Sequence, residues 1–455
     1  MDALRAISPT DGRYRDQLSE LENYFSEMAL MRYRLVVEIE YFIDLSLEEG
    51  VKEFPALSTE SQSALRSIYR NFTADDAETI KAIEGRTKHD VKAIEYFLRE
   101  KLTGLHLNAY QEFLHFALTS EDANNLAYSM MWCDAVSEIY RPLILDLFRS
   151  VERFAGEYRA QPMLSMTHGQ SATPTTVGKE FAVFAARLHR QIEQLKTHKL
   201  QAKLNGSTGT WGAHVVAYPY VDWIEFSKRF VTKLGFEPNI LTTQIEPHDS
   251  LAESFHILSR INAILIDFCR DVWMYISRGI LGQTKKEGEV GSSTMPHKIN
   301  PIYFENAEGN LGIANAYFLH LAEKLPISRM QRDLSDSTVL RNQGVPLAHS
   351  VLACKNILQG LSRLTVNQSQ LEKELDLHWE VLAEAVQTIL RKHRIPNAYE
   401  KLKELTRGQH ITKESLRSFI QTLDIPEDEK SKLLALTPRM YTGLADKLAG
   451  IGTHE

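Results

Sequence analysis

The chain has 455 residues, and its 52 Lys and Arg against 59 Asp and Glu give a formal net charge of -7. This balance argues against a nucleic-acid-binding protein, which would carry a basic excess or stripe. No apolar run approaches the ~20 residues of a membrane span, and the N-terminus lacks the apolar core of a secretory signal. The three cysteines, Cys133, Cys269 and Cys354, are far apart in the sequence, which suits a reducing compartment. We therefore expect a soluble cytoplasmic protein that binds neither nucleic acid nor membrane.

Two segments of the N-terminal part show helical spacing of apolar residues, Leu18 to Leu47 and Ala74 to Leu102. Short polar stretches interrupt the helical pattern there, at 85–90 (GRTKHD) and 118–122 (LTSED). Taken alone, each stretch can be explained without any function, as a solvated turn or a helix cap. In the second stretch, Thr119 or Ser120 is a good N-cap residue.

The middle of the chain predicts unusually long helices, over 174–204, 250–280 and 337–361, with another that begins near Pro301. These lengths exceed the average of ~11–12 residues, so the helices need partners along their whole length. A central bundle that continues across subunits satisfies this need, and it predicts a homo-oligomer.

Strand signals are few, and residues 212–223 (GAHVVAYPYVDW) are the best candidate for a short hairpin. After about Arg363 the pattern changes to shorter helices. We therefore predict an all-α fold in which a central bundle of long helices lies between smaller helical terminal domains. The predicted boundaries are 1–110, 111–362 and 363–455.

Common cofactor signatures are absent from the sequence. The glycines of 206–212 (GSTGTWG) are spaced GxxGxxG rather than GxGxxG, and neither GxxxxGK[ST] nor HExxH occurs. The sixteen histidines show no strong metal-ligand spacing. We expect no cofactor and no metal.

The stretch 288–301 (GEVGSSTMPHKINP) combines glycines, hydroxyls and a lysine between two long helices. A serine in such a loop becomes a base when backbone N–H groups and Lys298 stabilise its oxyanion. No GxSxG elbow supports a hydrolase. The set instead suits removal of a carbon-bound proton beside a carboxylate, with Lys298 and Asn300 binding the carboxylate oxygens. A histidine elsewhere, such as the one in 166–174 (MTHGQSATP), would protonate the leaving group. Removal of the carbon-bound proton and departure of this group together make a β-elimination.

Residues 291–301 (GSSTMPHKINP) resemble the signature G-S-S-x-M-P-x-K-x-N-P of the fumarase/aspartase superfamily. The histidine that follows Met-Pro, His297, resembles the residue at this position in the branch of the superfamily that cleaves adenylosuccinate, in its bacterial form. The resemblance extends over the chain, through SPTDGRY, HDVKAIEYFL, FALTSED, THGQSATPTT, TTQIEPHD, KLPISRMQRDLSDSTVLRN and NAYEKLKELTRG.

This resemblance implies a role for individual residues. Ser292 would be the general base, His168 the acid that protonates the leaving nitrogen, and Glu305 the residue that orients this histidine. The substrate carboxylates would be held by Thr119, Ser120, Ser293, Lys298 and Asn300. The nucleotide-binding positions would be Arg13, Tyr14, His89, Asp90, Gln244, Asn306, Arg332, Ser337, Thr338 and Arg341.

Simpler alternatives stay open for some of these residues. Arg332 and Asp333 could pair with each other on the surface. His89 could serve only as a helix-terminal cap. The histidines at positions 115, 189, 214 and 297 are interpreted as structural or supporting residues. One departure from the family pattern is Lys88, where the family often has asparagine.

The resemblance implies a lyase of purine nucleotide biosynthesis that cleaves adenylosuccinate to AMP and fumarate. It would also cleave the succinylated aminoimidazole carboxamide ribotide, whose reacting centre is the same. The expected assembly is a homotetramer with shared active sites. Two alternatives remain: a lyase of the argininosuccinate or fumarase type, and a non-catalytic helical scaffold.

Overall fold

The computed structural model describes residues 3–284, 299–406 and 411–450. Its contacts divide the chain into two compact units. Unit 1 comprises Met1–Ile144, Ile192–Ala263 and Gly309–Ala353, and unit 2 comprises Leu145–Gln191, Ile264–Glu308 and Cys354–Glu455. Each unit gathers three separate stretches, whereas the predicted boundaries follow chain order. The three-domain division stays a prediction.

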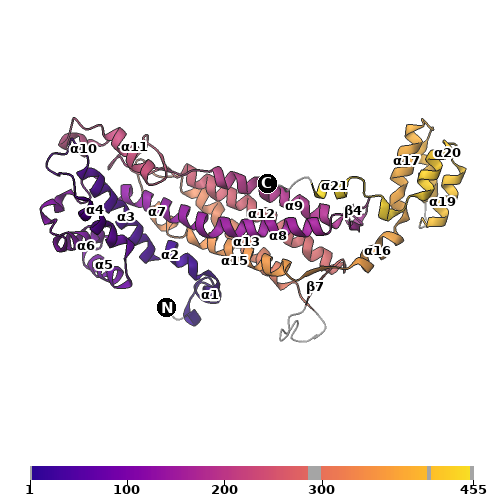
Figure 1. The fold of residues 1–455 in the computed structure, drawn as a ribbon, viewed down its shortest axis with the longest axis horizontal. Helices are drawn as coiled ribbons and strands as arrows, with labels where there is room; N and C mark the ends of the chain where they lie inside the picture. Colours follow the sequence, from indigo (N-terminus) through magenta and orange to yellow (C-terminus); the bar gives the residue numbers. More distant parts are fainter. Residues whose placement is uncertain (1–2, 285–298, 407–410, 451–455) are drawn as a thin grey trace. The chain divides into compact units, whose positions relative to one another are not determined.

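Most of the regular structure in the described residues is helical, as the sequence predicts (Figure 1). The helices of unit 1 are α1 (Arg15–Leu18), α2 (Glu22–Phe25), α3 (Glu27–Ser46), α4 (Thr59–Arg70), α5 (Ala74–Thr87), α6 (Asp90–Gly104), α7 (Ser120–Ala135), α10 (Gly212–Ala217), α11 (Trp223–Lys233) and α14 (Ser335–Leu340). Five long helices contribute residues to both units: α8 (Arg141–Glu157), α9 (Val177–Thr197), α12 (Asp249–Ser277), α13 (Ile302–Lys324) and α15 (Gly344–Leu361).

Unit 2 contains a series of shorter helices after the long ones. These are α16 (Gln368–Leu377), α17 (Ala383–Lys392), α18 (Ala398–Thr406), α19 (Lys413–Thr422), α20 (Glu427–Ala435) and α21 (Ala445–Ala449). Figure 1 shows α17, α19 and α20 gathered together, and they share an apolar cluster that includes Leu390, Ile420 and Leu433.

The strands have two or three residues each and only join helices. Antiparallel pairs form between β1 (Pro162–Met163) and β4 (Thr175–Thr176), β2 (Met166–Thr167) and β3 (Gln170–Ser171), and β7 (Leu281–Gln283) and β8 (Leu364–Val366). In unit 1, β5 (Gln201–Ala202) and β6 (Glu237–Pro238) pair in parallel.

A group of aromatic side chains packs together in the core of unit 1. Trp132 of α7 is almost fully buried and donates its indole N–H to Ser254 of α12 over 2.9 Å. Its ring centroid lies 4.9 Å from that of Phe255, which stacks on Phe318 of α13. Burial of such large rings supplies much of the apolar stabilisation in a helical core.

Several predicted helices are shorter or broken in the structure. The segment 18–47 is divided at Ser26, whose hydroxyl accepts a hydrogen bond from the Ala29 N–H and caps α3. The segment 337–361 is divided into α14 and α15. Pro346 fits only the first turn of a helix, because it lacks an N–H and its ring would clash with the preceding turn. A side chain at Gly344 would also approach Phe25 to 2.4 Å.

The predicted helix over 174–204 is also too long. Thr175 and Thr176 pair with β1, and α9 ends at Thr197 before β5. The predicted hairpin over 212–223 is wrong: this segment forms α10 and the start of α11. Asp222 accepts a hydrogen bond from the Glu225 N–H over 3.0 Å, so its cap starts a helix where the valines and tyrosines favour a strand.

The predicted helical segment 74–102 is divided at Lys88, inside the polar stretch 85–90 that was expected to interrupt it. Lys88 caps the end of α5 with φ 57° and ψ 27°. A left-handed conformation costs a lysine about 1 kcal/mol, whereas asparagine adopts it more readily. We therefore expect Lys88→Asn to raise the free energy of unfolding by about 0.5–1 kcal/mol, measured by urea unfolding. Lys88→Gln is the matched control, since it removes the same charge without this backbone preference. Equal stability of the two variants would contradict the prediction.

Candidate functional site

Thr119 and Ser120 lie at the N-terminus of α7, where Thr119 is the N-cap residue as predicted. The Thr119 N–H donates to Oδ2 of Asp122 over 2.9 Å, which fixes the turn that leads into the helix. The first N–H groups of a helix and its dipole favour an anion at this end. The predicted carboxylate-binding role is therefore compatible with the local geometry.

Asp122 connects this turn to the glycine-containing segment at 203–207. Its carboxylate, which is fully buried, accepts hydrogen bonds from the N–H groups of Asn205 and Gly206 at 3.0 and 3.1 Å. The Lys203 ammonium, also fully buried, lies 3.0 Å from Oδ1 of Asp122 and donates to the Gly206 carbonyl. Sequence analysis missed this ion pair.

Arg332 is held between two side chains of other segments. Its Nη2 lies 3.2 Å from Oε2 of Glu121, and its Nη1 donates to Oε1 of Gln244 over 3.1 Å. Gln244 in turn donates to the Ser207 carbonyl over 2.8 Å. The alternative that Arg332 pairs with Asp333 is wrong, because Asp333 instead accepts from the Arg329 N–H. The structure thus brings two predicted nucleotide-binding residues into direct contact.

Asp90 and Arg341, also predicted together, form an ion pair with a nitrogen–oxygen distance of 3.1 Å. The same Asp90 oxygen accepts from Arg34 over 2.8 Å, and Arg34 donates to Asn124 of α7 over 2.9 Å. Burial alone would raise the pKa of Asp90, but the two guanidinium groups hold it below its ordinary value. Asp90 is therefore ionised at neutral pH and fixes both arginines.

His89 is the N-cap residue of α6, as the simpler alternative suggested. Its Nδ1 accepts a hydrogen bond from the Lys92 N–H over 3.1 Å. A neutral ring in this arrangement carries its proton on Nε2, and the side chain remains about half exposed. The capping role leaves one ring nitrogen available to a ligand.

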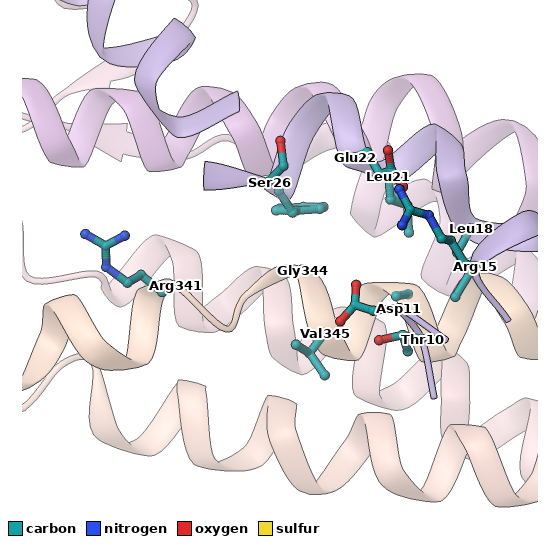
Figure 2. A pocket seen from close by; sticks show the side chains of 12 residues that line it. Thr10, Asp11, Arg15, Leu18, Leu21, Glu22, Ser26, Arg341, Gly344 and Val345 are labelled. Atoms are coloured by element: carbon teal, nitrogen blue, oxygen red, sulfur yellow. The ribbon is translucent and has the colours of Figure 1, made fainter. Parts of the chain in front are cut away.

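A cavity of about 270 Å³ lies beside Arg341 (Figure 2). Figure 2 shows it between the N-terminal segment, from which Asp11 and Arg15 line it, and the start of α15 at Gly344. The predicted residues Arg13 and Tyr14 belong to this N-terminal segment but do not line the cavity. The Arg13 guanidinium lies 5.8 Å from the Tyr14 ring centroid.

The remaining predicted residues of unit 1 lie on the short helix α14. The Ser337 N–H donates to the buried Asp336, and the Thr338 carbonyl accepts from the Asn342 side chain over 3.0 Å. Ser337 is half-buried and Thr338 is exposed. Both residues follow Arg332 within six positions of the sequence.

His168 of unit 2 lies at the tip of the β2–β3 hairpin. The two turn residues, His168 and Gly169, have φ values of 53° and 71°, the combination of a two-residue type I′ turn. The hairpin exposes the imidazole to solvent in the single chain.

Glu305 lies on the first turn of α13, also in unit 2, and is exposed. Its Oε1 accepts a hydrogen bond from the Trp273 indole over 3.1 Å. No hydrogen bond joins Glu305 to His168 in the described part of this single chain. Asn300 and Asn306 flank Glu305 and are half-buried. The predicted acid and the residue predicted to orient it are therefore not paired within one chain.

No distances or contacts are given for four residues of the signature segment, because Ser292, Ser293, His297 and Lys298 lie outside the described residues. The predicted site residues that are described fall into two groups, one in each unit. The group of unit 1 consists of Arg13, Tyr14, His89, Asp90, Thr119, Ser120, Gln244, Arg332, Ser337, Thr338 and Arg341. The group of unit 2 consists of His168, Asn300, Glu305 and Asn306.

Two histidines interpreted as structural have partners in the interior of unit 1. His115 lies 2.6 Å from the buried Glu38. Burial lowers its pKa, but the Glu38 carboxylate outweighs burial and raises it to about 9. His214 lies 3.2 Å from the Tyr41 hydroxyl, and burial lowers its pKa to about 4. Both contacts agree with a structural role.

The unit 1 group combines a helix N-terminus with fixed guanidinium groups, which suits a ligand that carries several anionic oxygens. The unit 2 group adds an exposed imidazole and a carboxylate suited to proton transfer. Taken together, the two groups fit acid–base chemistry on a polyanionic small molecule.

Comparison with protein families gives two matches. The family model described as "Lyase" matches residues 12–314, and the one described as "Adenylosuccinate lyase C-terminal" matches residues 328–442. Among solved structures, a fumarate lyase from Mesorhizobium sp. BNC1 aligns with a TM-score of 0.74 at 18% identity, covering 95% of this chain and 96% of that chain. The 3-carboxy-cis,cis-muconate lactonizing enzyme from Pseudomonas putida aligns with a TM-score of 0.74 at 19% identity, covering 95% of each chain. The two solved structures therefore share the mostly helical fold of this chain.

Curated relatives are much more similar in sequence. The adenylosuccinate lyase of Legionella pneumophila (strain Corby) is 51% identical over 449 residues, 98% of each chain. The adenylosuccinate lyase of Escherichia coli (strain K12) is 50% identical over 446 residues, again 98% of each chain. Such identity over almost the whole length agrees with both family models. The chain therefore belongs to the adenylosuccinate lyase family.

Proposed function

We infer that the chain cleaves adenylosuccinate to AMP and fumarate by β-elimination, in purine nucleotide biosynthesis. The observation that carries this inference is the 51% identity to an adenylosuccinate lyase over 98% of both chains. The geometry of the unit 1 group supports it. A substrate with one phosphate and two carboxylates needs local cations in a protein whose net charge is -7.

In the proposed mechanism, Ser292 removes the proton from the carbon next to a carboxylate. The electrons pass to the carboxylate oxygens, where Lys298, Asn300 and Ser293 bind the developing charge. Thr119 and Ser120 hold the second carboxylate at the α7 N-terminus. His168 donates a proton to the leaving nitrogen as the carbon–nitrogen bond breaks, and Glu305 orients and charges this histidine.

The nucleotide part of the substrate contacts the remaining predicted residues. Arg332 and Arg341 already have partners that fix them, so their guanidinium groups are preorganised for the anionic oxygens. Arg13, Tyr14, His89, Asp90, Gln244, Asn306, Ser337 and Thr338 complete this subsite. The succinylated aminoimidazole carboxamide ribotide carries the same reacting group and is the second proposed substrate. No cofactor takes part in these steps.

We propose a homotetramer in the cytoplasm, with active sites that combine residues of several subunits. The described residues include no helix long and apolar enough to cross a membrane, and the three cysteines are unpaired. Ile313 and Tyr317 lie one turn apart on α13 and expose 47% and 39% of their surface in the single chain. Burial of this apolar face against other copies of the chain would explain why both apolar side chains are exposed in the single chain.

Replacement of Ile313 by aspartate is expected to shift the assembly from tetramer to smaller species, because a carboxylate would be buried without a partner. Light scattering coupled to size exclusion measures the mass at fixed protein concentration. Val216→Asp is the matched control, since Val216 is 85% exposed on the short helix α10. An unchanged mass for Ile313→Asp would contradict the proposed use of the α13 face.

The proposed function is tested by offering purified protein adenylosuccinate and argininosuccinate separately. Equal amounts of AMP and fumarate are expected from adenylosuccinate, with no fumarate from argininosuccinate. Fumarate from argininosuccinate alone would contradict the proposal and favour the other lyase type. Binding of AMP without fumarate release from either compound would favour a non-catalytic scaffold.

A further inference from the structure

A buried cluster of Glu121, His248 and Asp336 lies beside Arg332 in unit 1. Their side chains come from three separate segments, and the relative exposures of the residues are 1%, 4% and 3%. One potential ligand atom from each lies within 4.8 Å of the other two. Sequence analysis assigned no role to any of these three residues.

The cluster contains polar atoms that no described neighbour satisfies. Oε1 of Glu121, Nε2 of His248 and Oδ2 of Asp336 are all buried without a hydrogen-bond partner. The other Glu121 oxygen pairs with Arg332, and the other Asp336 oxygen accepts from the Ser337 N–H. Buried polar atoms without partners are costly, so such a group needs a reason to persist.

Burial shifts the pKa values of all three groups in the direction that favours their neutral forms. Burial raises the pKa of Glu121 to about 8 and raises the pKa of Asp336, while burial lowers the pKa of His248 to about 4. The ring is therefore neutral at pH 7. The Arg332 guanidinium opposes the effect of burial on both carboxyl groups.

Arg332 is the cluster's link to the candidate site. Glu121 holds Nη2 and Gln244 holds Nη1, and each Nη group keeps a second N–H for a ligand. An arginine whose planar fork is fixed in advance loses less entropy when it binds an anionic oxygen pair. Without Glu121, one of its two anchors is lost.

We propose that Glu121 is a positioning residue for Arg332, through the ion pair that joins its Oε2 to Nη2 of the guanidinium. This inference rests on the proposed function, in which Arg332 contacts the nucleotide. Glu121 touches no substrate in this account and acts only through the guanidinium. The Arg332 guanidinium supplies positive charge beside both the Glu121 and the Asp336 carboxyl groups.

A double-mutant cycle tests this coupling. Arg332→Ala is expected to raise the KM for adenylosuccinate by about a hundredfold and Glu121→Ala by about tenfold. In the double variant the KM is expected to equal that of Arg332→Ala alone to within about twofold. Calorimetric titration with AMP gives the same cycle as dissociation constants, independently of catalysis. Glu121→Gln keeps the oxygen that pairs with Arg332 and is expected to recover most of the loss.

Glu40→Ala is the matched control, because Glu40 is also a buried carboxylate with an arginine partner, Arg66, at 2.7 Å. It is expected to lower stability and leave the KM unchanged. If Glu121→Ala does not fold, Glu121→Asp takes its place in the cycle, because it keeps the carboxyl and shortens its reach. Additive effects of Glu121 and Arg332 would overturn the positioning role.

Two further results separate the possible failures. A divalent cation found in the purified protein at one per chain, and lost in Asp336→Asn, would overturn the proposal in favour of a metal site. A wild-type protein that releases no fumarate would refute the proposed function, while the calorimetric cycle with AMP would still decide the role of Glu121.

Discussion

The His168→Ala and Ser292→Ala variants are each expected to lower kcat for fumarate release from adenylosuccinate by about a thousandfold. General acid–base catalysis contributes typically about 10²- to 10⁴-fold, and each variant removes one of the two proposed proton-transfer groups. The KM is expected to change much less, since the anion-binding side chains are intact in both variants. Steady-state kinetics from initial rates of fumarate formation gives both constants.

His189→Ala is the matched control for the loss of an imidazole. His189 lies on α9 with its ring centroid 5.7 Å from that of Phe148, and it is assigned no catalytic role. Its kcat is expected to stay near the wild-type value. A kcat for Ser292→Ala near that of wild type would show that another group is the base. The same result for His168→Ala would remove the hairpin tip from the mechanism.

The Lys203→Met variant is expected to lower the free energy of unfolding by about 3–5 kcal/mol, because it leaves Asp122 as a buried charge without its ammonium partner. Both side chains are fully buried, and their nitrogen–oxygen distance is 3.0 Å. The loss is measured as a shift of the urea midpoint at fixed protein concentration, since dissociation of an oligomer contributes to the transition.

Lys432→Met is the control for this ion pair. Lys432 pairs with the exposed Asp428 at 3.2 Å and with the buried Glu429 at 3.5 Å, but Lys432 is itself more than half exposed and Glu429 keeps Lys392 as a partner. Exposed pairs contribute little to stability. If Lys203→Met and Lys432→Met had the same midpoint of urea unfolding, Lys203 would not stabilise the Asp122 carboxylate.

A lower affinity for fumarate in Lys203→Met is also expected, since Asp122 fixes the turn at Thr119.

Helices with a continuous apolar stripe could be predicted well from the sequence. The predicted helix over 250–280 corresponds to α12 at Asp249–Ser277, because Leu251, Phe255, Leu258 and Ile261 follow the helical period. The break within 85–90 was expected from its polar residues, but the exact position of a break was harder to predict, because it depends on single residues. Lys88 adopts the left-handed conformation without glycine or asparagine to signal it, and Gly344 is required by the approach of Phe25.

The candidate site could be predicted only in part, for a different reason. Residues in motifs, such as Gln244 with Arg332 and Asp90 with Arg341, are in contact in the structure. The supporting residues were missed because their partners lie far apart in the sequence. Asp122 looks like an ordinary member of a capping box, and nothing near Lys203 in the sequence indicates that its ammonium is buried.

We propose that His168 and Ser292 belong to one elimination site that several chains build together. The most direct test mixes the inactive His168→Ala and Ser292→Ala proteins, allows their subunits to exchange, and measures fumarate release from adenylosuccinate. If different chains supply the two residues to a site, some sites in mixed oligomers contain both, and activity returns that neither variant shows alone. Absence of activity in oligomers that native mass spectrometry shows to be mixed would contradict this account.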